Sequence, residues 1–176
     1  MTGPSAGPRI VLVGPMGVGK STVGELLAAR LGCGFRDTDA DIVAGQGREI
    51  SDIFIEEGEP HFRELERAAV RTAVAGHDGV LALGGGAILD AGTRELLGAH
   101  PVVYLSMDVD EAVKRTGLNV ARPLLTVANP RKQWRELMEA RRHLYTDVAR
   151  VVVATDGRTP EEVAQAVLDA LELKEA

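Results

Sequence analysis

The sequence predicts a three-layer α/β fold, in which helices cover both faces of a parallel β-sheet, and three observations support this prediction. Short runs rich in β-branched residues alternate with segments of helical spacing, which is the pattern of βαβ units. The runs at 9–13 and 79–83 are almost continuously apolar, as expected for strands covered on both faces. A glycine-rich turn, residues 14–19, joins the first run to the first helical segment.

Length and composition fit one compact domain. The chain has 176 residues, of which 45% are apolar and 26% charged; aromatic residues are few, so Val, Leu, Ile and Ala must form the core. The net charge of −6 disfavours nucleic-acid binding, which depends on clustered Lys and Arg. The N-terminal segment lacks the apolar region of a signal peptide, no apolar run approaches the roughly 20 residues of a membrane span, and a single cysteine permits no internal disulfide. We therefore expect a cytoplasmic monomer that binds neither nucleic acid nor membranes.

Strands and helices can be placed in order along the chain. We expect strands at residues 9–13, 35–37, 79–83, 102–106 and 151–154. We expect helices at residues 19–31, 51–58, 60–75 and 108–116, and two more that begin at 130 and 160. The last of these has the clearest start, because Thr159 can cap the helix and Pro160 suits its first turn. Residues 117–129 show no regular period and carry Gly, Asn and Pro, so they predict a long loop of the kind that often acts as a lid.

Residues 14–21 form the most specific motif of the chain. They match the pattern G-x4-G-K-[ST] between a predicted strand and a predicted helix, which is the context of a phosphate-binding P-loop. The glycines let backbone N–H groups surround phosphate oxygens, and the helix N-terminus adds partial positive charge. In such loops the Lys, here Lys20, reaches the β- and γ-phosphates, and the hydroxyl of Ser21 is a ligand of Mg²⁺. The predicted nucleotide contacts are Gly17, Val18, Gly19, Lys20, Ser21 and Thr22.

Two acids after the second strand, Asp37 and Asp39, are candidates for the metal and the phosphoryl acceptor. P-loop proteins usually hold Mg²⁺ with an acid at the end of a neighbouring strand, but the strand at 79–83 runs into three glycines instead. In an extended segment, residues i and i+2 point the same way, roughly 6.5 Å apart. We therefore predict that Asp37 serves Mg²⁺, directly or through water, and that Asp39 serves the acceptor. The alternative for this segment is an Asx-type turn that caps a helix.

Arginines near apolar helix faces predict an anionic acceptor. The helix that begins at residue 130 carries an apolar stripe, and Arg141 lies within it. An inward Arg is costly unless it meets an anion, which a bound carboxylate would supply with bidentate geometry. Arg63 borders the stripe of an earlier helix and is a second candidate. It could instead be a surface residue paired with Glu59 or Glu66 at helical spacing.

The 117–129 loop and the glycine turn complete the candidate site. Arg122 lies in this loop and Arg115 precedes it. An Arg on a lid can close over the phosphoryl group and neutralise its developing charge, as an arginine finger does, although an ordinary solvated loop Arg is the alternative. The three glycines at 84–86 could be a simple turn, but their place at the carboxyl end of a parallel strand favours close approach of a ligand.

Together these motifs resemble the shikimate kinase family, of the nucleoside-monophosphate-kinase-like P-loop class. The matching segments are Gly14-Pro15-Met16-Gly17-Val18-Gly19-Lys20-Ser21-Thr22, Asp37-Thr38-Asp39, Phe62-Arg63-x-x-Glu66, Leu83-Gly84-Gly85-Gly86, Arg122-Pro123-Leu124-Leu125 and Arg141-x-x-Leu144-Tyr145. They occur in the family's order with spacings that look typical, and the resemblance extends from about Arg9 to Leu171. Each segment after the first is short, but the ordered set is specific.

The resemblance implies a fold, a reaction and a set of site residues. It implies a five-stranded parallel sheet of order 2-3-1-4-5, a shikimate-binding helical region at about 38–75 and a lid at about 117–129. It implies transfer of the γ-phosphoryl group of ATP to the 3-hydroxyl of shikimate, with Mg²⁺, in aromatic amino-acid biosynthesis. The implied shikimate-binding residues are Asp39, Arg63, Gly84, Gly85, Gly86 and Arg141, with Phe54 and Phe62 as walls of the pocket.

The resemblance also assigns roles around the nucleotide. Lys20, Ser21 and Arg122 would serve the phosphates and metal, and the residues implied in catalysis are Lys20, Asp39 and Arg122. Arg115 and Arg158 would flank the adenine. For the substrate carboxylate, the spacing to Leu144-Tyr145 selects Arg141 over its neighbour Arg142.

Three other functions are compatible with parts of this pattern. A gluconate kinase on the same scaffold also takes a polyhydroxy carboxylate, so the arginines alone do not exclude it; the Asp-Thr-Asp, Gly-Gly-Gly and Arg-Pro-Leu-Leu segments favour shikimate. A nucleoside monophosphate kinase is disfavoured because no base-recognising segment is evident. A non-catalytic nucleotide-binding regulatory module would differ by releasing no ADP in response to a small acceptor.

Overall fold

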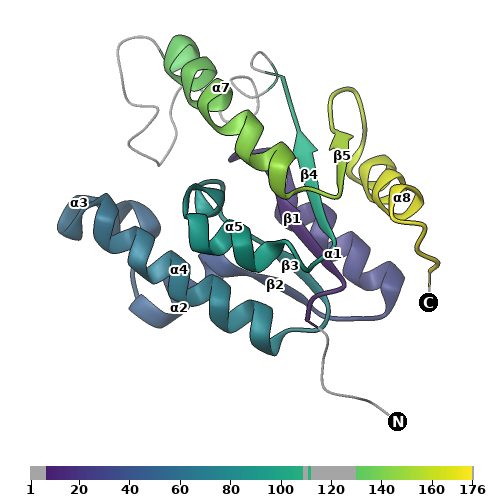
Figure 1. Ribbon diagram of the computed structural model, residues 1–176, viewed down its shortest axis with the longest axis horizontal. Coiled ribbons are helices and arrows are strands. Elements are labelled where there is room, and N and C mark those ends of the chain that lie inside the picture. The colour runs from purple at the N-terminus through teal and green to yellow at the C-terminus, as the bar shows by residue number, and fades with distance from the viewer. Residues whose placement is uncertain (1–6, 109–110, 112–129, 176) are drawn as a thin grey trace.

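The computed structural model describes residues 7–108, 111 and 130–175, and every element named below belongs to them (Figure 1). The strands are β1 (Ile10–Val13), β2 (Phe35–Asp37), β3 (Val80–Ala82), β4 (Val102–Ser106) and β5 (Val151–Ala154). The helices are α1 (Lys20–Leu31), α2 (Thr38–Gln46), α3 (Ile50–Glu57), α4 (Glu59–Gly76), the 3-10 helix η1 (Ala87–Leu89), α5 (Ala91–Leu97), α7 (Pro130–Val148) and α8 (Pro160–Ala170).

The five strands form one parallel sheet in the order β2-β3-β1-β4-β5, which confirms the predicted architecture. β1 is the central strand: its Val11 is in register with Leu81 of β3 on one side and with Val102 of β4 on the other. The residues of β1 are at most 1% exposed, because helices cover both faces of the sheet, and this explains why its sequence is continuously apolar. In a parallel sheet the strands share one carboxyl edge, so the loops after β1, β2 and β3 lie side by side.

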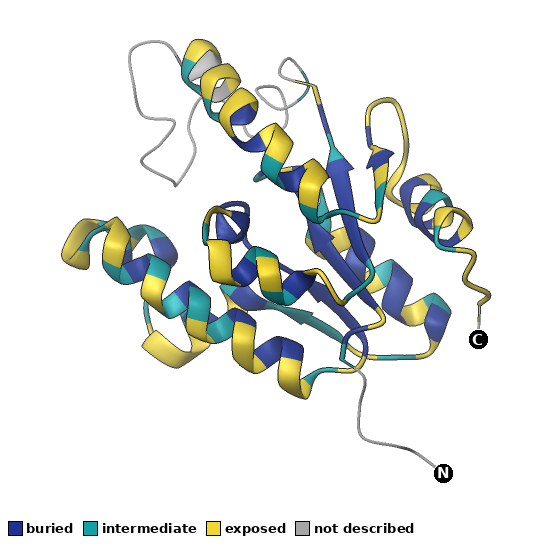
Figure 2. Ribbon diagram, in the orientation of Figure 1, coloured by how far each residue is buried: buried dark blue, intermediate teal, exposed yellow. Residues whose placement is uncertain are grey.

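Helices on the two faces of the sheet give three layers (Figures 1 and 2). On one face, α1 and α8 pack against each other and against side chains such as Leu12. On the other face, α4, α5 and α7 pack against side chains such as Val11 and Tyr104. Adjacent residues of β1 therefore enter opposite cores, as the two-residue period of a strand requires. A smaller cluster around Ile53 and Phe62 holds α2, α3 and the start of α4 together.

Both ends of α1 and the start of α8 follow the predicted helix signals within one residue. α1 begins after Gly19, which has a φ of 99°, and ends at Gly32, which has a φ of 66°. Glycine adopts these left-handed conformations without the steric cost that a side chain would add. α8 begins with a complete capping box, in which the Glu162 N–H donates to Thr159 Oγ1 at 3.2 Å and the Thr159 N–H donates to Glu162 Oε1 at 3.1 Å.

Helix α5 was not predicted from the sequence, and α2 was expected only as part of the helical region at about 38–75 and as the capped alternative after Asp37. Each begins at an aspartate that caps it: Asp37 accepts from the N–H groups of Asp39 and Ala40, and Asp90 accepts from the N–H of Thr93. A cap of this kind stabilises a short helix that has little intrinsic preference to form.

The predicted helix at 108–116 is described only at its start, where Asp108 Oδ1 accepts a hydrogen bond from the Glu111 N–H at 2.8 Å, as a helix cap does. The structure does not describe the rest of this predicted helix, residues 109–110 and 112–116. The predicted lid at 117–129 also lies outside the described residues. Arg115 and Arg122 therefore also lie outside the described part of the chain.

Candidate active site

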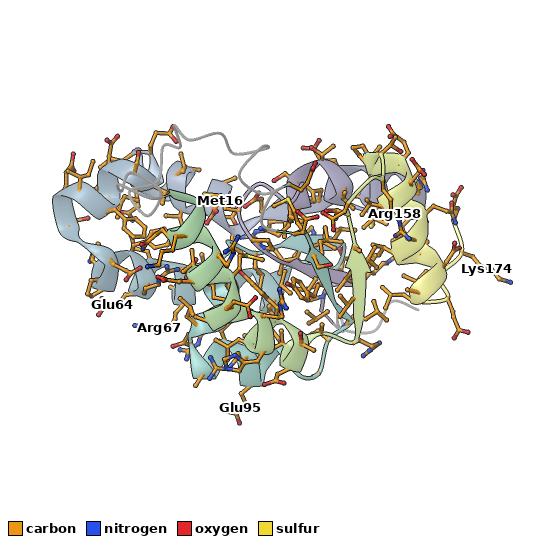
Figure 3. The ribbon with its side chains drawn as sticks, turned by 90° about the horizontal axis from the view of Figure 1, so that it is seen from above. Met16, Glu64, Arg67, Glu95, Arg158 and Lys174 are labelled. Atoms are coloured by element: carbon orange, nitrogen blue, oxygen red, sulfur yellow. The ribbon has the colours of Figure 1, made fainter. Side chains whose placement is uncertain are left out.

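Three adjoining cavities lie at the carboxyl edge of the sheet. The first is lined by residues that include Phe54, Phe62, Arg63, Gly85, Gly86 and Arg141. The second is lined by residues that include Lys20, Ser21, Asp37 and Asp39. The third is lined by residues that include Val18, Thr155 and Arg158. Met16 borders the first two cavities and Gly17 the second and third, so the three adjoin one another. Figure 3 labels Met16, and Arg158 beside α8.

The loop between β1 and α1 is shaped by its glycines and closed by Lys20. Gly14 has a φ of 151°, and a Cβ at this position would lie 2.5 Å from the carbonyl oxygen of Leu105, so only glycine fits. Lys20 Nζ donates to the carbonyl oxygens of Gly14 at 2.7 Å and Pro15 at 3.0 Å, which holds the ammonium group over the loop. The predicted nucleotide residues of this loop therefore gather around the second and third cavities.

Asp37 contributes its two carboxylate oxygens to two different tasks. Oδ1 caps α2 by accepting from the N–H groups of Asp39 at 2.8 Å and Ala40 at 3.4 Å. Oδ2 accepts from the Ser21 hydroxyl at 2.7 Å, so the two predicted metal ligands are in direct contact. The expectation of an extended 37–39 segment is wrong, because the cap ends the strand at Asp37 and starts a helix at once.

Asp39 lies in the first turn of α2 and lines the phosphate-loop cavity. A Cβ on Gly84 would lie 2.6 Å from Asp39 Oδ1 and 3.0 Å from Glu66 Oε2, so both carboxylates pack directly on this glycine. Asp37 and Asp39 thus share one cavity, as predicted, but through the start of a helix and not through strand alternation. Gly84 itself lies beneath the site and does not line the first two cavities.

Arg63 both lines a cavity and forms ion pairs on its own helix, the two alternatives that the sequence offered for it. It lines the first cavity, and its guanidinium donates to Glu66 at 2.8 Å and to Glu59 at 3.2 Å. Its guanidinium carbon lies 5.3 Å from the ring centroid of Phe62, within the range of a cation–π contact. Burial raises the pKa of the Glu66 carboxyl above its ordinary value, against the opposing influence of the Arg63 charge. The ion pairs hold the Arg63 guanidinium at the wall of the cavity.

The Arg63–Glu66 pair leads to a stability prediction. Glu66→Ala is expected to lower the free energy of unfolding by about 2–3 kcal/mol, because the Glu66 side chain is only 5% exposed and its loss leaves Arg63 partly uncompensated. Glu59→Ala is the matched control, because Glu59 is the other partner of Arg63 and its side chain is 51% exposed. This substitution should lower the free energy of unfolding by at most about 0.5 kcal/mol. Urea denaturation of both variants measures the difference, and equal effects would show that burial does not decide the strength of the pair.

Arg141 is buried and faces the first cavity, which confirms that it lies on the inward stripe of α7. It is 8% exposed, and its Nε atom has no hydrogen-bond partner among the described residues. The neighbouring Arg142 points away: its side chain is 60% exposed and pairs with Glu139 at 3.2 Å. The structure therefore supports the choice of Arg141 over Arg142 as the guanidinium that meets a bound anion.

Sequence reasoning missed the part that Tyr145 plays in this site. Its side chain is 1% exposed and its hydroxyl donates to the carbonyl oxygen of Gly85 at 2.5 Å, which ties α7 to the glycine turn. A signal was present, because Tyr145 follows Arg141 by four residues on the same helix face, and a buried Tyr usually needs an acceptor for its hydroxyl.

The third cavity lies between the phosphate loop and the start of α8. Arg158 and Thr155 line it together with Val18, which is 2% exposed and so contributes an apolar wall. This arrangement brings Arg158 to the predicted nucleotide site from a turn far along the chain.

Comparison with known proteins agrees with this geometry. The sequence profile of the family described as shikimate kinase matches residues 16–172. A shikimate kinase of Streptomyces avermitilis is 79% identical over 169 residues, which cover 96% of this chain and 98% of that protein. A solved shikimate kinase from Acinetobacter baumannii in complex with shikimate is 40% identical, with a TM-score of 0.90 over 96% of this chain and 94% of that one.

A gluconokinase from Sinorhizobium meliloti is similar in fold alone, at 18% identity and a TM-score of 0.55 over 94% of this chain and 91% of that one. The chain is thus far more similar in sequence to shikimate kinases than to this gluconokinase, the other kind of metabolite kinase compatible with the sequence motifs. The profile match, moreover, runs from the phosphate loop through both arginine-bearing helices to the last helix. The chain therefore belongs to the shikimate kinase family.

Proposed function

We propose that this protein transfers the γ-phosphoryl group of ATP to the 3-hydroxyl of shikimate and so produces ADP and shikimate 3-phosphate, a step toward chorismate and the aromatic amino acids. The observation that carries the proposal is the adjacency of two cavities, since the pocket with two arginines shares Met16 and Gly85 with the cavity lined by the phosphate loop. The Acinetobacter relative was solved with shikimate, which supports the same acceptor here.

Within the first cavity, Arg63 and Arg141 bind the carboxylate of the acceptor. Each guanidinium can bind a carboxylate through two parallel N–H···O hydrogen bonds, and the low exposure of Arg141 strengthens such a pair. Phe54 and Phe62, whose ring centroids are 4.8 Å apart, form the apolar wall against which the acceptor ring packs. Gly85 and Gly86 allow the backbone to approach the acceptor closely.

The donor set around Ser21 and Asp37 fits Mg²⁺. The two oxygens lie 2.7 Å apart, close to the roughly 2.9 Å that separates neighbouring ligands of an octahedral Mg²⁺ ion with bonds of 2.0–2.1 Å. Mg²⁺ usually takes only one or two protein oxygens and completes its coordination with water and phosphate. When bound, the ion neutralises charge on the β- and γ-phosphate oxygens.

The double role of Asp37 can be tested by two substitutions. Asp37→Asn keeps an oxygen that can cap α2 but loses the charge, so we expect the apparent affinity for Mg²⁺ to fall roughly tenfold or more while the melting temperature changes little. Asp37→Ala removes the cap as well and should also lower stability by about 1 kcal/mol. Mg²⁺ titration of ATP turnover and thermal unfolding measure the two effects; equal loss of stability in both variants would contradict the division of roles.

In the proposed reaction, Asp39 orients the 3-hydroxyl of the acceptor and accepts its proton as the oxygen attacks the γ-phosphorus. The bond between that phosphorus and the β–γ bridging oxygen breaks, and ADP leaves without a covalent enzyme intermediate. Lys20 and Arg122 stabilise the charge on the transferred group. Closure of residues 117–129 excludes water, which would otherwise accept the phosphoryl group in place of shikimate.

The remaining assignments belong to the same proposal. Residues 38–75 act as the shikimate-binding region and 117–129 as the lid, and Arg115 and Arg158 flank the adenine.

Across the described helices, none has the length and apolar character that a membrane crossing needs. We propose that the protein works as a cytoplasmic monomer that uses neither nucleic acid nor a membrane.

Acceptor-dependent release of ADP tests the function directly. Turnover with Mg-ATP is compared for shikimate, gluconate, quinate, AMP and no acceptor. Turnover that requires shikimate is expected. Turnover with another acceptor only would preserve the kinase chemistry but overturn the assignment of the pocket, and ATP binding without any acceptor-dependent turnover would point to a regulatory module.

A further inference from the structure

The glycine turn between β3 and η1 presents two backbone donors toward the first cavity. The Gly84 N–H donates to Thr38 Oγ1 at 3.3 Å, and the carbonyls of Gly84 and Gly86 accept from N–H groups three residues further on, each at 3.1 Å. In contrast, neither the N–H of Gly85 nor that of Gly86 donates to an acceptor within the described residues. Both glycines are buried and line the cavity. Buried backbone N–H groups are almost always paired, so water or a bound ligand in the cavity must be the acceptor for these two.

The carbonyl between these two donors is held by Tyr145. Its hydroxyl donates to the Gly85 oxygen at 2.5 Å across a separation of 60 residues. The Tyr145 ring stacks on the ring of Tyr104, with the ring centroids 4.9 Å apart and the ring planes at 21°. Burial raises the pKa of Tyr145 to about 12, with the nearby charge of Arg141 opposing the rise, so the hydroxyl remains a donor at neutral pH.

This hydrogen bond also determines where the next N–H points. The Gly85–Gly86 peptide is trans, so its carbonyl and the Gly86 N–H point in opposite directions. Gly86 lies against Arg63, since a Cβ on Gly86 would clash with the guanidinium. The donor that Tyr145 orients is therefore next to one of the two arginines proposed to bind the acceptor carboxylate.

We propose that Tyr145 is a positioning residue for the acceptor: its hydroxyl holds the Gly85–Gly86 peptide so that the Gly86 N–H is directed at the substrate carboxylate beside Arg63. Tyr145 follows Arg141 by one turn of α7, so the same contact sets the register in which the helix presents that arginine to the cavity. The inference rests on the proposed function, because it assigns a carboxylate to this part of the cavity.

The test is Tyr145→Phe, which keeps the ring stack and removes only the hydroxyl. We expect KM and the dissociation constant for shikimate to rise roughly tenfold, because the Gly85 carbonyl loses its partner and the peptide loses its fixed orientation. KM for ATP should stay unchanged. A shikimate analogue with a hydroxymethyl group in place of the carboxylate should bind the variant and the wild type equally weakly, measured by calorimetry.

Tyr104→Phe is the matched control, because it removes a hydroxyl from the other ring of the same stack without touching the glycine turn. It should leave both KM values unchanged. Wild-type values for shikimate in Tyr145→Phe would overturn the inference, and so would equal losses for shikimate, ATP and the analogue, which would indicate a general structural role. Absence of shikimate turnover in the wild type would instead remove the proposed function, and the inference with it.

Discussion

Asp39→Asn is expected to lower kcat for shikimate phosphorylation by about 10³-fold, within the 10²–10⁴ range typical of a lost general base. The substitution preserves the size of the side chain that packs on Gly84 and lines the phosphate-loop cavity, but it removes the carboxylate that accepts the proton. KM for ATP should be unchanged, since Lys20 and the loop glycines remain in place. Steady-state kinetics with coupled ADP detection measures both parameters.

Asp41→Asn provides the control for Asp39→Asn. Asp41 lies two residues further along α2, pairs with Arg36 at 2.7 Å and is not among the residues that line the three cavities. The loss of one carboxylate from the same helix at this position should leave kcat near the wild-type value. A similar fall in kcat for both variants would mean that charge on α2, and not proton transfer by Asp39, supports the reaction.

Arg141→Ala is expected to raise KM and the dissociation constant for shikimate by about 10³-fold, which corresponds to about 4 kcal/mol and lies within the range for truncation of a buried charge pair. The reason is the 8% exposure of Arg141: with so little water nearby, nothing replaces its contact with the carboxylate. Arg141→Lys should restore only part of the affinity, since a lysine keeps the charge but cannot reproduce bidentate geometry. Calorimetric titration with shikimate measures the effect, and titration with ATP should show no change.

Arg142→Ala is the matched control for Arg141→Ala. It removes the same type of side chain one position further on, where it is exposed and paired with Glu139. Shikimate binding should be unchanged in this variant. If Arg141→Ala raised the dissociation constant for ATP and left shikimate binding intact, Arg141 would bind the nucleotide and not the acceptor.

Local features of the chain allowed most of the fold to be predicted. The β1 strand, the phosphate loop and the Thr159 cap of α8 each depend on residues within a few positions of one another, so their patterns are visible in the sequence. The prediction of an extended segment at 37–39 was wrong because its local sequence fits two structures. An aspartate after a strand suits an extended continuation and a helix cap equally well, and the hydrogen bonds that decide for the cap form only once the segment has folded.

The class of fold, the phosphate-loop motif and the inward position of an arginine followed from the sequence alone, because periodicity and short motifs encode these features directly. The tertiary structure added that Arg63 lines the cavity and pairs with Glu66 at the same time, and that Tyr145 reaches Gly85. The contact of Tyr145 joins segments 60 residues apart, and the exposure of an arginine depends on which helices pack around it. The Tyr145–Gly85 hydrogen bond forms only when α7 packs beside the glycine turn, so the local sequence does not identify the acceptor of the Tyr145 hydroxyl.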